Sequence, residues 1–187
     1  MKNSINKKEI KLLKPHYPLG IGKKVEELFK KGELTEGKYS ERFEKKLSVY
    51  LNNKNCVLVN SGTSALTLAY RLLDLKKKDE VITTPFTCMA TNEPLFNENI
   101  KFKFCDIDPN TGNVCLKSIA KLINKKTKAI VVVHWGGLPV DIIKLKKIIY
   151  PRKIKIIEDA AHALGAKING KKIGNHGDYV CFSFQAI

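Results

Sequence analysis

The sequence predicts an α/β protein in which a mainly parallel sheet lies between two layers of helices. From about residue 56 onward, short apolar runs alternate with stretches of helical spacing through the 187-residue chain. The apolar runs are continuous rather than alternating with polar residues, which is typical of strands buried on both faces. Continuous strands separated by helices favour a three-layer α/β/α sandwich.

Each element is expected from its local pattern. β-Branched and aromatic residues cluster where strands are expected, at residues 56–60, 80–84, 101–107, 129–135, 154–158 and 179–184. Apolar residues recur every three or four positions where helices are expected, at residues 63–75, 88–96, 118–124 and 141–150. Two earlier helices, at 23–34 and 37–51, are expected to be joined by a turn that contains glycine.

Composition and charge exclude several classes of protein. The net charge of +16 is typical of nucleic-acid-binding proteins, but nearly all of it is lysine spread along the chain. Only Arg42, Arg71 and Arg152 offer the planar fork that suits bases and phosphates. We therefore expect solvated lysine-rich faces and no nucleic-acid partner. The sequence contains no apolar run of about 18 residues that would predict a membrane span.

The cysteines and the N-terminus predict a cytoplasmic protein. The five cysteines form no CxxC pair and no histidine–cysteine spacing of a metal site, so we expect neither a disulfide framework nor a metal. Several lie in apolar runs, where a free cysteine behaves as a small hydrophobe. The N-terminus lacks the apolar segment of a secretion signal.

Candidate chemistry is expected in the loops that follow the strands, because ligands of parallel sheets bind at the carboxyl ends of the strands. Residues 61–66, with the sequence SGTSAL, follow the first expected strand and open a helix. Small residues there leave backbone N–H groups available to an anion such as a phosphate. The alternative is an ordinary helix cap made by Ser61 or Thr63.

Three further segments carry polar or aromatic side chains at strand ends. Asp159 and His162 would share a helix face, and an aspartate there can hold a heterocyclic nitrogen protonated. The alternatives are a helix N-cap for Asp159 and a half-buried, hydrogen-bonded histidine for His162. For residues 133–137 (VHWGG) the alternatives are the wall of a pocket and an ordinary connection between a strand and a loop. Residues 83–94, rich in small and hydroxyl side chains, suit a loop packed near a ligand.

Together these segments resemble one family. Six motifs resemble those of the DegT/DnrJ/EryC1/StrS sugar aminotransferases in their order and spacing. They are SGTSAL, DEVITTPFT, HWGGLPVD, EDAAHALGA, GD at 177–178 and FSF at 182–184. Residues 32–47 also resemble the opening of that family. The resemblance covers about residues 15–187. It implies the large domain of a fold-type-I pyridoxal-phosphate enzyme, which works as a homodimer.

The resemblance also implies roles for cofactor-binding residues. The phosphate loop of the family falls on Gly62, Thr63 and Ser64, and Ser183 matches a further phosphate ligand. Asp159 matches the aspartate that forms a salt bridge with the pyridinium nitrogen and makes the ring an electron sink.

Other positions concern the ring and the substrate. His162 falls where many members have glutamine, and either side chain can hydrogen-bond the ring oxygen. Many members stack an aromatic side chain on the ring at the position of Cys88, and a thiol stacks poorly. Phe86 or Trp135 is expected to compensate. Phe86, His134 and Trp135 are expected to line the substrate pocket.

The lysine that forms the Schiff base in this family directly follows FSF-x-x-I, so we expect it at position 188, after Ile187. Residues 1–187 would then be an N-terminal arm and an incomplete large domain, inactive alone and without the C-terminal small domain. The implied reaction moves an amino group, from glutamate, to a keto carbon of a nucleotide-linked deoxysugar. The alternatives are a dehydratase of the same family, with histidine in place of the lysine, or a non-catalytic partner subunit.

Overall fold

The computed structural model describes residues 18–35 and 37–185, which belong to two compact units. Glu36, in the expected family opening, and Ile187, before the expected lysine, lie outside the described residues. In the first unit the described helix is α1 (Ile21–Lys31), which ends before Gly32, whereas the sequence predicts a helix over residues 23–34. Among the described residues, no helix is long and apolar enough to cross a membrane.

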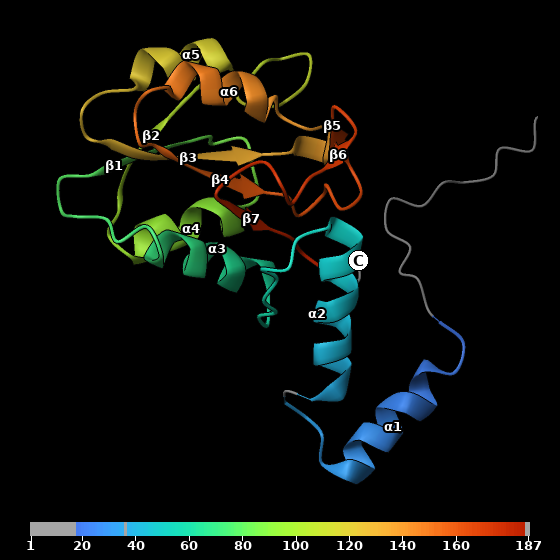
Figure 1. Ribbon diagram of the computed structural model, residues 1–187. Helices are drawn as coiled ribbons and strands as arrows, with labels where there is room; N and C mark the ends of the chain where they lie inside the picture. The colour runs from blue at the N-terminus through green and yellow to red at the C-terminus, as the bar shows by residue number, and fades with distance from the viewer. Residues whose placement is uncertain (1–17, 36, 186–187) are drawn as a thin grey trace, which may run out of the picture. The chain divides into compact units, whose positions relative to one another are not determined.

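The second unit, residues 38–184, is a three-layer α/β/α sandwich (Figure 1). Its five-stranded sheet has the order β2-β1-β3-β4-β7, and every neighbouring pair is parallel. The strands of this sheet are β1 (Glu80–Thr83), β2 (Lys101–Phe104), β3 (Thr127–Val133), β4 (Lys155–Asp159) and β7 (Tyr179–Cys181). A separate antiparallel hairpin joins β5 (Lys167–Ile168) and β6 (Lys171–Lys172). The predicted fold class is confirmed.

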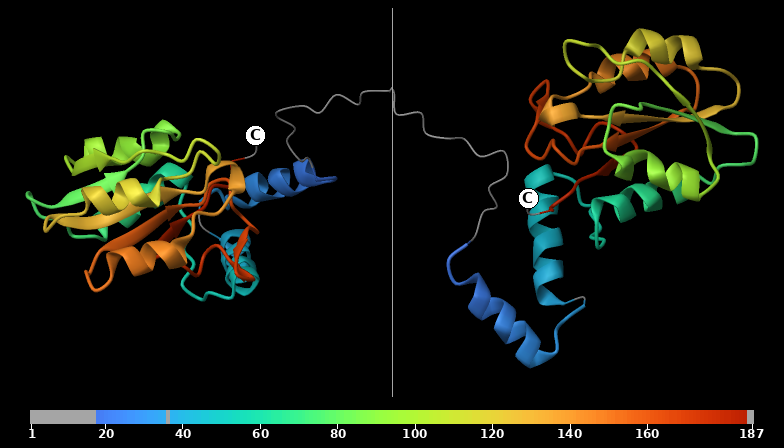
Figure 2. Two further views of the ribbon diagram at one scale, coloured as in Figure 1. Left: turned by 90° about the horizontal axis from the view of Figure 1, so that it is seen from above. Right: turned by 180° about the vertical axis from the view of Figure 1, so that it is seen from behind.

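Helices cover both faces of the sheet (Figure 1, and from behind in Figure 2). One layer consists of α5 (Leu116–Leu122) and α6 (Ile142–Ile149). The other consists of α3 (Gly62–Arg71) and α4 (Met89–Asn97). The unit opens with α2 (Lys38–Leu51), and a short 3-10 turn, η1 (Trp135–Gly137), follows β3.

Alternate residues of each strand face the two helical layers. Ile130 and Val132 of β3 belong to the core beneath α5 and α6. Ala129 and Val131 belong to the core beneath α3 and α4. All four have no exposed surface, and burying a valine or isoleucine side chain stabilises the fold by about 1.5–3 kcal/mol. Because both faces are buried, every position of β3 must be compatible with a core, which explains the continuous apolar run.

The strand expected at residues 56–60 is wrong. This segment belongs to no strand and pairs with no other segment in the part of the chain that the structure describes. Val57 is 73% exposed, and the amide of Leu58 donates to Glu44 Oε1 at 2.8 Å instead of to a neighbouring strand. A β-prone sequence forms a strand only where another strand offers hydrogen-bonding partners.

Candidate functional site

The candidate site lies at the carboxyl ends of the strands. The chain leaves β1 toward β2 on one side, whereas β3 pairs with the other side of β1. Ligands of open parallel sheets bind at such a topological switch point. The loops that follow β1 and β3 meet there, since the ring centroids of Phe86 and Trp135 are 4.4 Å apart.

Asp159 is a buried carboxylate at the last position of β4, with 6% of its surface exposed. Thr91 Oγ1 donates to its Oδ2 at 2.6 Å, and the amide of Ala161 donates to its Oδ1 at 3.1 Å. Among the described residues no helix begins after Asp159, so the N-cap alternative does not apply. None of the ion pairs among the described residues involves Asp159. Burying a charge without a cationic partner is costly, so this position fits a cationic ligand.

The charge of Asp159 affects its neighbours. Burial, and then the negative charge of Asp159, raises the pKa of the Tyr70 hydroxyl. The same two causes raise the pKa of the Cys181 thiol to about 12. Both groups are therefore neutral at physiological pH, and neither adds a second negative charge near the carboxylate.

The N-terminus of α3 combines a helix cap with free amides. Ser61 Oγ accepts from the amide of Ser64 at 3.0 Å, so the capping alternative is realised at Ser61. The cap uses only that amide, and in the described part of the chain the amides of Gly62 and Thr63 donate to no protein acceptor. A Cβ atom on Gly62 would lie 3.1 Å from Ser183 Cβ, so the fold brings these two expected phosphate ligands together.

Aromatic side chains lie beside this end of the sheet. The ring centroids of Trp135 and His162 are 6.0 Å apart, in an edge-on arrangement. Gly137 has a φ of 85°, and a Cβ atom there would lie 2.8 Å from the carbonyl oxygen of His162. Glycine at this position therefore lets the loop after β3 approach the loop after β4. Cys88 is exposed directly before α4, and its side chain makes no cap hydrogen bond.

The expectation that His134 lines a pocket does not hold for its side chain, which has no exposed surface. Its Nδ1 accepts from the amide of Val140 at 3.0 Å, and its Nε2 is 2.7 Å from Glu158 Oε2. The other carboxylate oxygen of Glu158 accepts from the amide of Gly177. His134 thus connects β3 to β4 beneath the site instead of forming its wall. His162, expected to be half-buried if structural, is instead exposed.

Sequence reasoning named neither Thr91 nor Asn113, and both organise the site. Thr87 and Thr91 are four residues apart, a spacing that indicates neighbouring side chains in a helix, although Thr87 lies just before the start of α4. Asn113 Oδ1 accepts from the amide of Trp135 and its Nδ2 donates to the carbonyl of Leu138, both at 2.9 Å. Asn113 lies in a loop without periodic pattern, so nothing in the sequence marks it.

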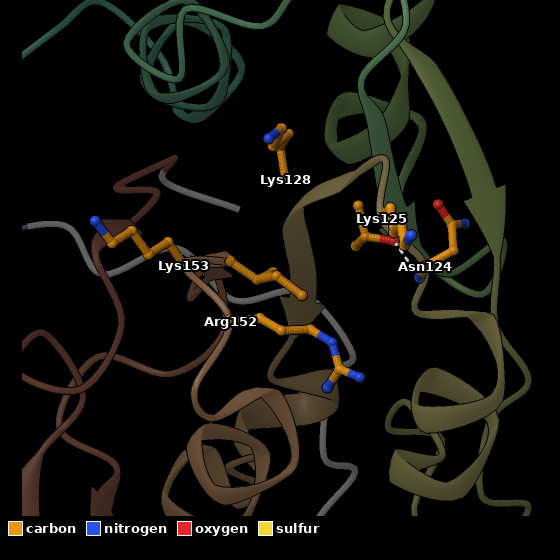
Figure 3. Close-up of a pocket in the computed structure, with 7 residues that line it drawn as sticks. Asn124, Lys125, Lys128, Arg152 and Lys153 are labelled. Carbon is orange, nitrogen blue, oxygen red and sulfur yellow. Dashed lines mark hydrogen bonds between the residues drawn. The ribbon is translucent and has the colours of Figure 1, made fainter.

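A hollow of about 370 Å³ lies at the opposite end of the strands, where β3 and β4 begin (Figure 3). Its lining contains four cationic side chains, those of Lys125, Lys128, Arg152 and Lys153. Figure 3 shows Lys128, Arg152 and Lys153 pointing in different directions rather than at one point. None of the residues expected at the site lines this hollow, so it is not part of the site.

Comparison with known proteins identifies relatives of this chain and of its fold. A UDP-4-amino-4,6-dideoxy-N-acetyl-beta-L-altrosamine transaminase of Campylobacter jejuni is 40% identical over 157 residues, which are 82% of this chain and 41% of that protein. The sugar aminotransferase CalS13 of Micromonospora echinospora superposes with a TM-score of 0.89 at 34% identity, over 96% of this chain and 50% of that one. The E. coli GDP-4-keto-6-deoxy-D-mannose-3-dehydratase with bound hydrated PLP gives a TM-score of 0.84 at 30% identity, over 90% and 45%.

The chain spans about half the length, or less, of these relatives. The match to the family itself extends over nearly all of the chain, from residue 20 to residue 187. With a parallel sheet, a small-residue helix N-terminus and a buried aspartate in the places that the family resemblance implies, the chain belongs to the DegT/DnrJ/EryC1/StrS aminotransferase family.

Proposed function

We propose that this chain carries the cofactor-binding residues of a pyridoxal-phosphate-dependent aminotransferase that acts on a nucleotide-linked deoxysugar. The amino group would come from glutamate, and the enzyme would work as a homodimer. The observation that carries the proposal is the buried carboxylate of Asp159, held by two protein donors and paired with no cation among the described residues. The names of the relatives support the sugar substrate.

The residues present fit the cofactor at both of its ends. The free amides of Gly62 and Thr63, at the positive end of the α3 dipole, suit a phosphate dianion. The hydroxyls of Thr63, Ser64 and Ser183 would add further donors. At the other end, Asp159 would hold the proton on the ring nitrogen. Bound pyridoxal phosphate supplies an electron sink for breaking a bond at the carbon that bears the amino group.

The aromatic side chains would shape the space around the ring. Phe86 and Trp135 contact each other beside the switch point and can exclude water from it. We propose that they line the substrate pocket and that they compensate for Cys88 at the ring face. His162, exposed next to Trp135, would donate to the ring oxygen of the cofactor. We assign the Schiff-base amine to none of the described lysines, because the family resemblance implies a lysine at position 188.

A dehydratase of the same family is the second candidate function, because the E. coli GDP-4-keto-6-deoxy-D-mannose-3-dehydratase superposes on 90% of this chain. Both candidates need Asp159 and the phosphate loop. They differ in the residue expected at position 188, lysine for the transaminase and histidine for the dehydratase. The residue encoded after Ile187 therefore separates them.

The role of Asp159 is tested with pyridoxamine 5′-phosphate, which needs no lysine to bind. Titration calorimetry of the chain should show binding, and Asp159→Asn should weaken it at least tenfold, about 1.4 kcal/mol, because a neutral amide no longer attracts the protonated ring. Asp141→Asn is the matched control. Asp141 caps α6 through Lys144 N, a role that asparagine fills equally well, so affinity should not change.

Two outcomes would contradict the proposal. If circular dichroism shows that the chain is folded and the chain still binds no pyridoxamine 5′-phosphate, the proposed cofactor is wrong. Equal affinity in the Asp159→Asn and Asp141→Asn proteins would show that Asp159 does not contact the ring nitrogen.

A further inference from the structure

We propose that Thr91 is a positioning residue which, with Thr87 behind it, fixes the orientation of the Asp159 carboxylate toward the ring nitrogen of the cofactor. This inference rests on the proposed function and deepens it, since it assigns a role to two hydroxyl groups that are not cofactor ligands. It is carried by a chain of short hydrogen bonds at the start of α4.

The direction of these hydrogen bonds follows from counting protons. Thr91 Oγ1 lies 2.6 Å from Asp159 Oδ2 and 2.7 Å from Thr87 Oγ1. An ionised carboxylate can only accept, so the single hydroxyl proton of Thr91 points to Asp159. Thr87 must then donate to Thr91. The relay therefore runs one way, from Thr87 through Thr91 to the carboxylate, and a bond to a charged acceptor is stronger than a neutral one.

Thr91 is itself firmly held. It has no exposed surface, its carbonyl accepts from the hydroxyl of Tyr70 at 2.7 Å, and its amide donates to the carbonyl of Cys88 at 3.1 Å. The next residue, Asn92, accepts from Thr83 Oγ1 and donates to the carbonyl of Thr84, both at 2.8 Å. These bonds fix the start of α4 to α3 and to the end of β1, so the Thr91 hydroxyl has a defined place.

The relay leaves Asp159 with one orientation. Thr91 occupies one side of Oδ2 and the amide of Ala161 occupies one side of Oδ1. Rotation of the carboxylate would break both bonds, and unpaired buried polar groups are costly. Each oxygen keeps a second lone pair, which is available to a cation. Two protein donors therefore hold the carboxylate in place before any ligand arrives, which lowers the cost of ordering on binding.

The test compares Thr91→Val, which keeps the shape but removes the hydroxyl, with Thr91→Ser, which keeps the hydroxyl. Pyridoxamine 5′-phosphate should bind about tenfold more weakly to Thr91→Val, whereas Thr91→Ser should bind nearly as well as the wild-type chain. Binding of inorganic phosphate, which reports only the phosphate loop, should not change in either. Thr127→Val is the matched control, because Thr127 is also buried and hydrogen-bonded, to Asn124 N at 3.0 Å, but lies at the start of β3.

A double mutant separates positioning from a merely structural role. If Thr91 acts through Asp159, then adding Thr91→Val to Asp159→Asn should weaken binding by much less than it does in the wild-type background. A structural defect would instead weaken binding by the same factor in both backgrounds, and that result would overturn the inference. Wild-type affinity in Thr91→Val would do so as well.

These failures are distinguishable from failure of the proposed function. If the folded wild-type chain binds no pyridoxamine 5′-phosphate, the proposed function fails and the positioning role fails with it. If the wild-type chain binds and Asp159→Asn weakens binding while Thr91→Val does not, only the role of Thr91 is wrong.

Discussion

Glu158 and Asp159 occupy successive positions of β4, so their side chains point to opposite faces of the sheet. Asp159 faces the hydroxyl group of Thr91 in α4. Glu158 faces the ring of His134, whose Nδ1 accepts a hydrogen bond from the amide of Val140, so the ring N–H that faces Glu158 is the one on Nε2. Glu158 thus receives N–H donors from His134 and from Gly177. Two buried carboxylates at one strand end are tolerated because each has its own donors.

Gly177 offers a test of the Glu158 network. A Cβ atom at Gly177 would lie 2.6 Å from Glu158 Oε1 and 3.0 Å from the carbonyl oxygen of Ile156. Both atoms are buried, so Gly177→Ala should lower the free energy of unfolding by about 1–3 kcal/mol, measured by urea denaturation. At Gly37 a Cβ atom meets nothing within 4 Å, and Gly37→Ala should be neutral or slightly stabilising. Equal stability of the two variants would show that Glu158 can move aside freely.

Among the helices and strands, the sequence predicts those whose hydrophobic pattern reflects burial in the fold. The continuous apolar run predicts β3 and the helical spacing predicts α6. Both predictions succeed because the residues that pack against these elements lie within the same unit. Residues 56–60 carry the same kind of signal but have no partner strand among the described residues. The expected strands 101–107 and 179–184 end early, at Phe104 and Cys181, because pairing stops there. A local pattern reports what a segment prefers, and only the fold decides what it pairs with.

The same distinction applies to the candidate site. The family resemblance assigns cofactor-binding roles to Asp159, Gly62 and Ser183 by their order in the chain, and these roles stay predictions. The segment 83–94, rich in small and hydroxyl side chains, is expected near a ligand. Which hydroxyl reaches Asp159 depends on the packing of α4 against α3 and β1, and no local signal carries that information. His134 was misplaced for the same reason, because its orientation follows from the register of β3 with β4.

Hydrogen exchange should separate residues 56–60 from the strands. In the described part of the chain, the amides of Val57 and Val59 donate to no protein acceptor and their side chains are exposed. The amides of β3 lie between β1 and β4 and are buried. In heavy water, Val57 and Val59 should therefore exchange orders of magnitude faster than Val131 and Val132, which require larger openings. Comparable protection in both segments would mean that residues 56–60 are paired in solution.

In the molecule as a whole, positively charged side chains greatly outnumber negatively charged ones. The chain has 34 lysines and arginines against 18 acids. The ion pairs that the structure describes are mostly exposed, such as Lys155 with Asp178 at 2.7 Å, and exposed pairs contribute at most about 1 kcal/mol each. Repulsion among like charges destabilises a compact state. Where cations gather without acids, as around the hollow at the start of β3 and β4, this repulsion should be strongest.

This charge imbalance predicts an unusual response to salt. The screening length is about 30 Å at 0.01 M salt and about 10 Å at 0.1 M, so added sodium chloride should weaken repulsion across the molecule and raise the melting temperature. Removing two cations of the hollow, in Lys128→Gln with Lys153→Gln, should raise the melting temperature at low salt and reduce its dependence on salt. Lys155→Gln is the matched control, because it removes a cation that is paired with Asp178 and should give no such gain. A melting temperature that falls as sodium chloride is added would show that attractive ion pairs, rather than repulsion, dominate the electrostatics of the fold.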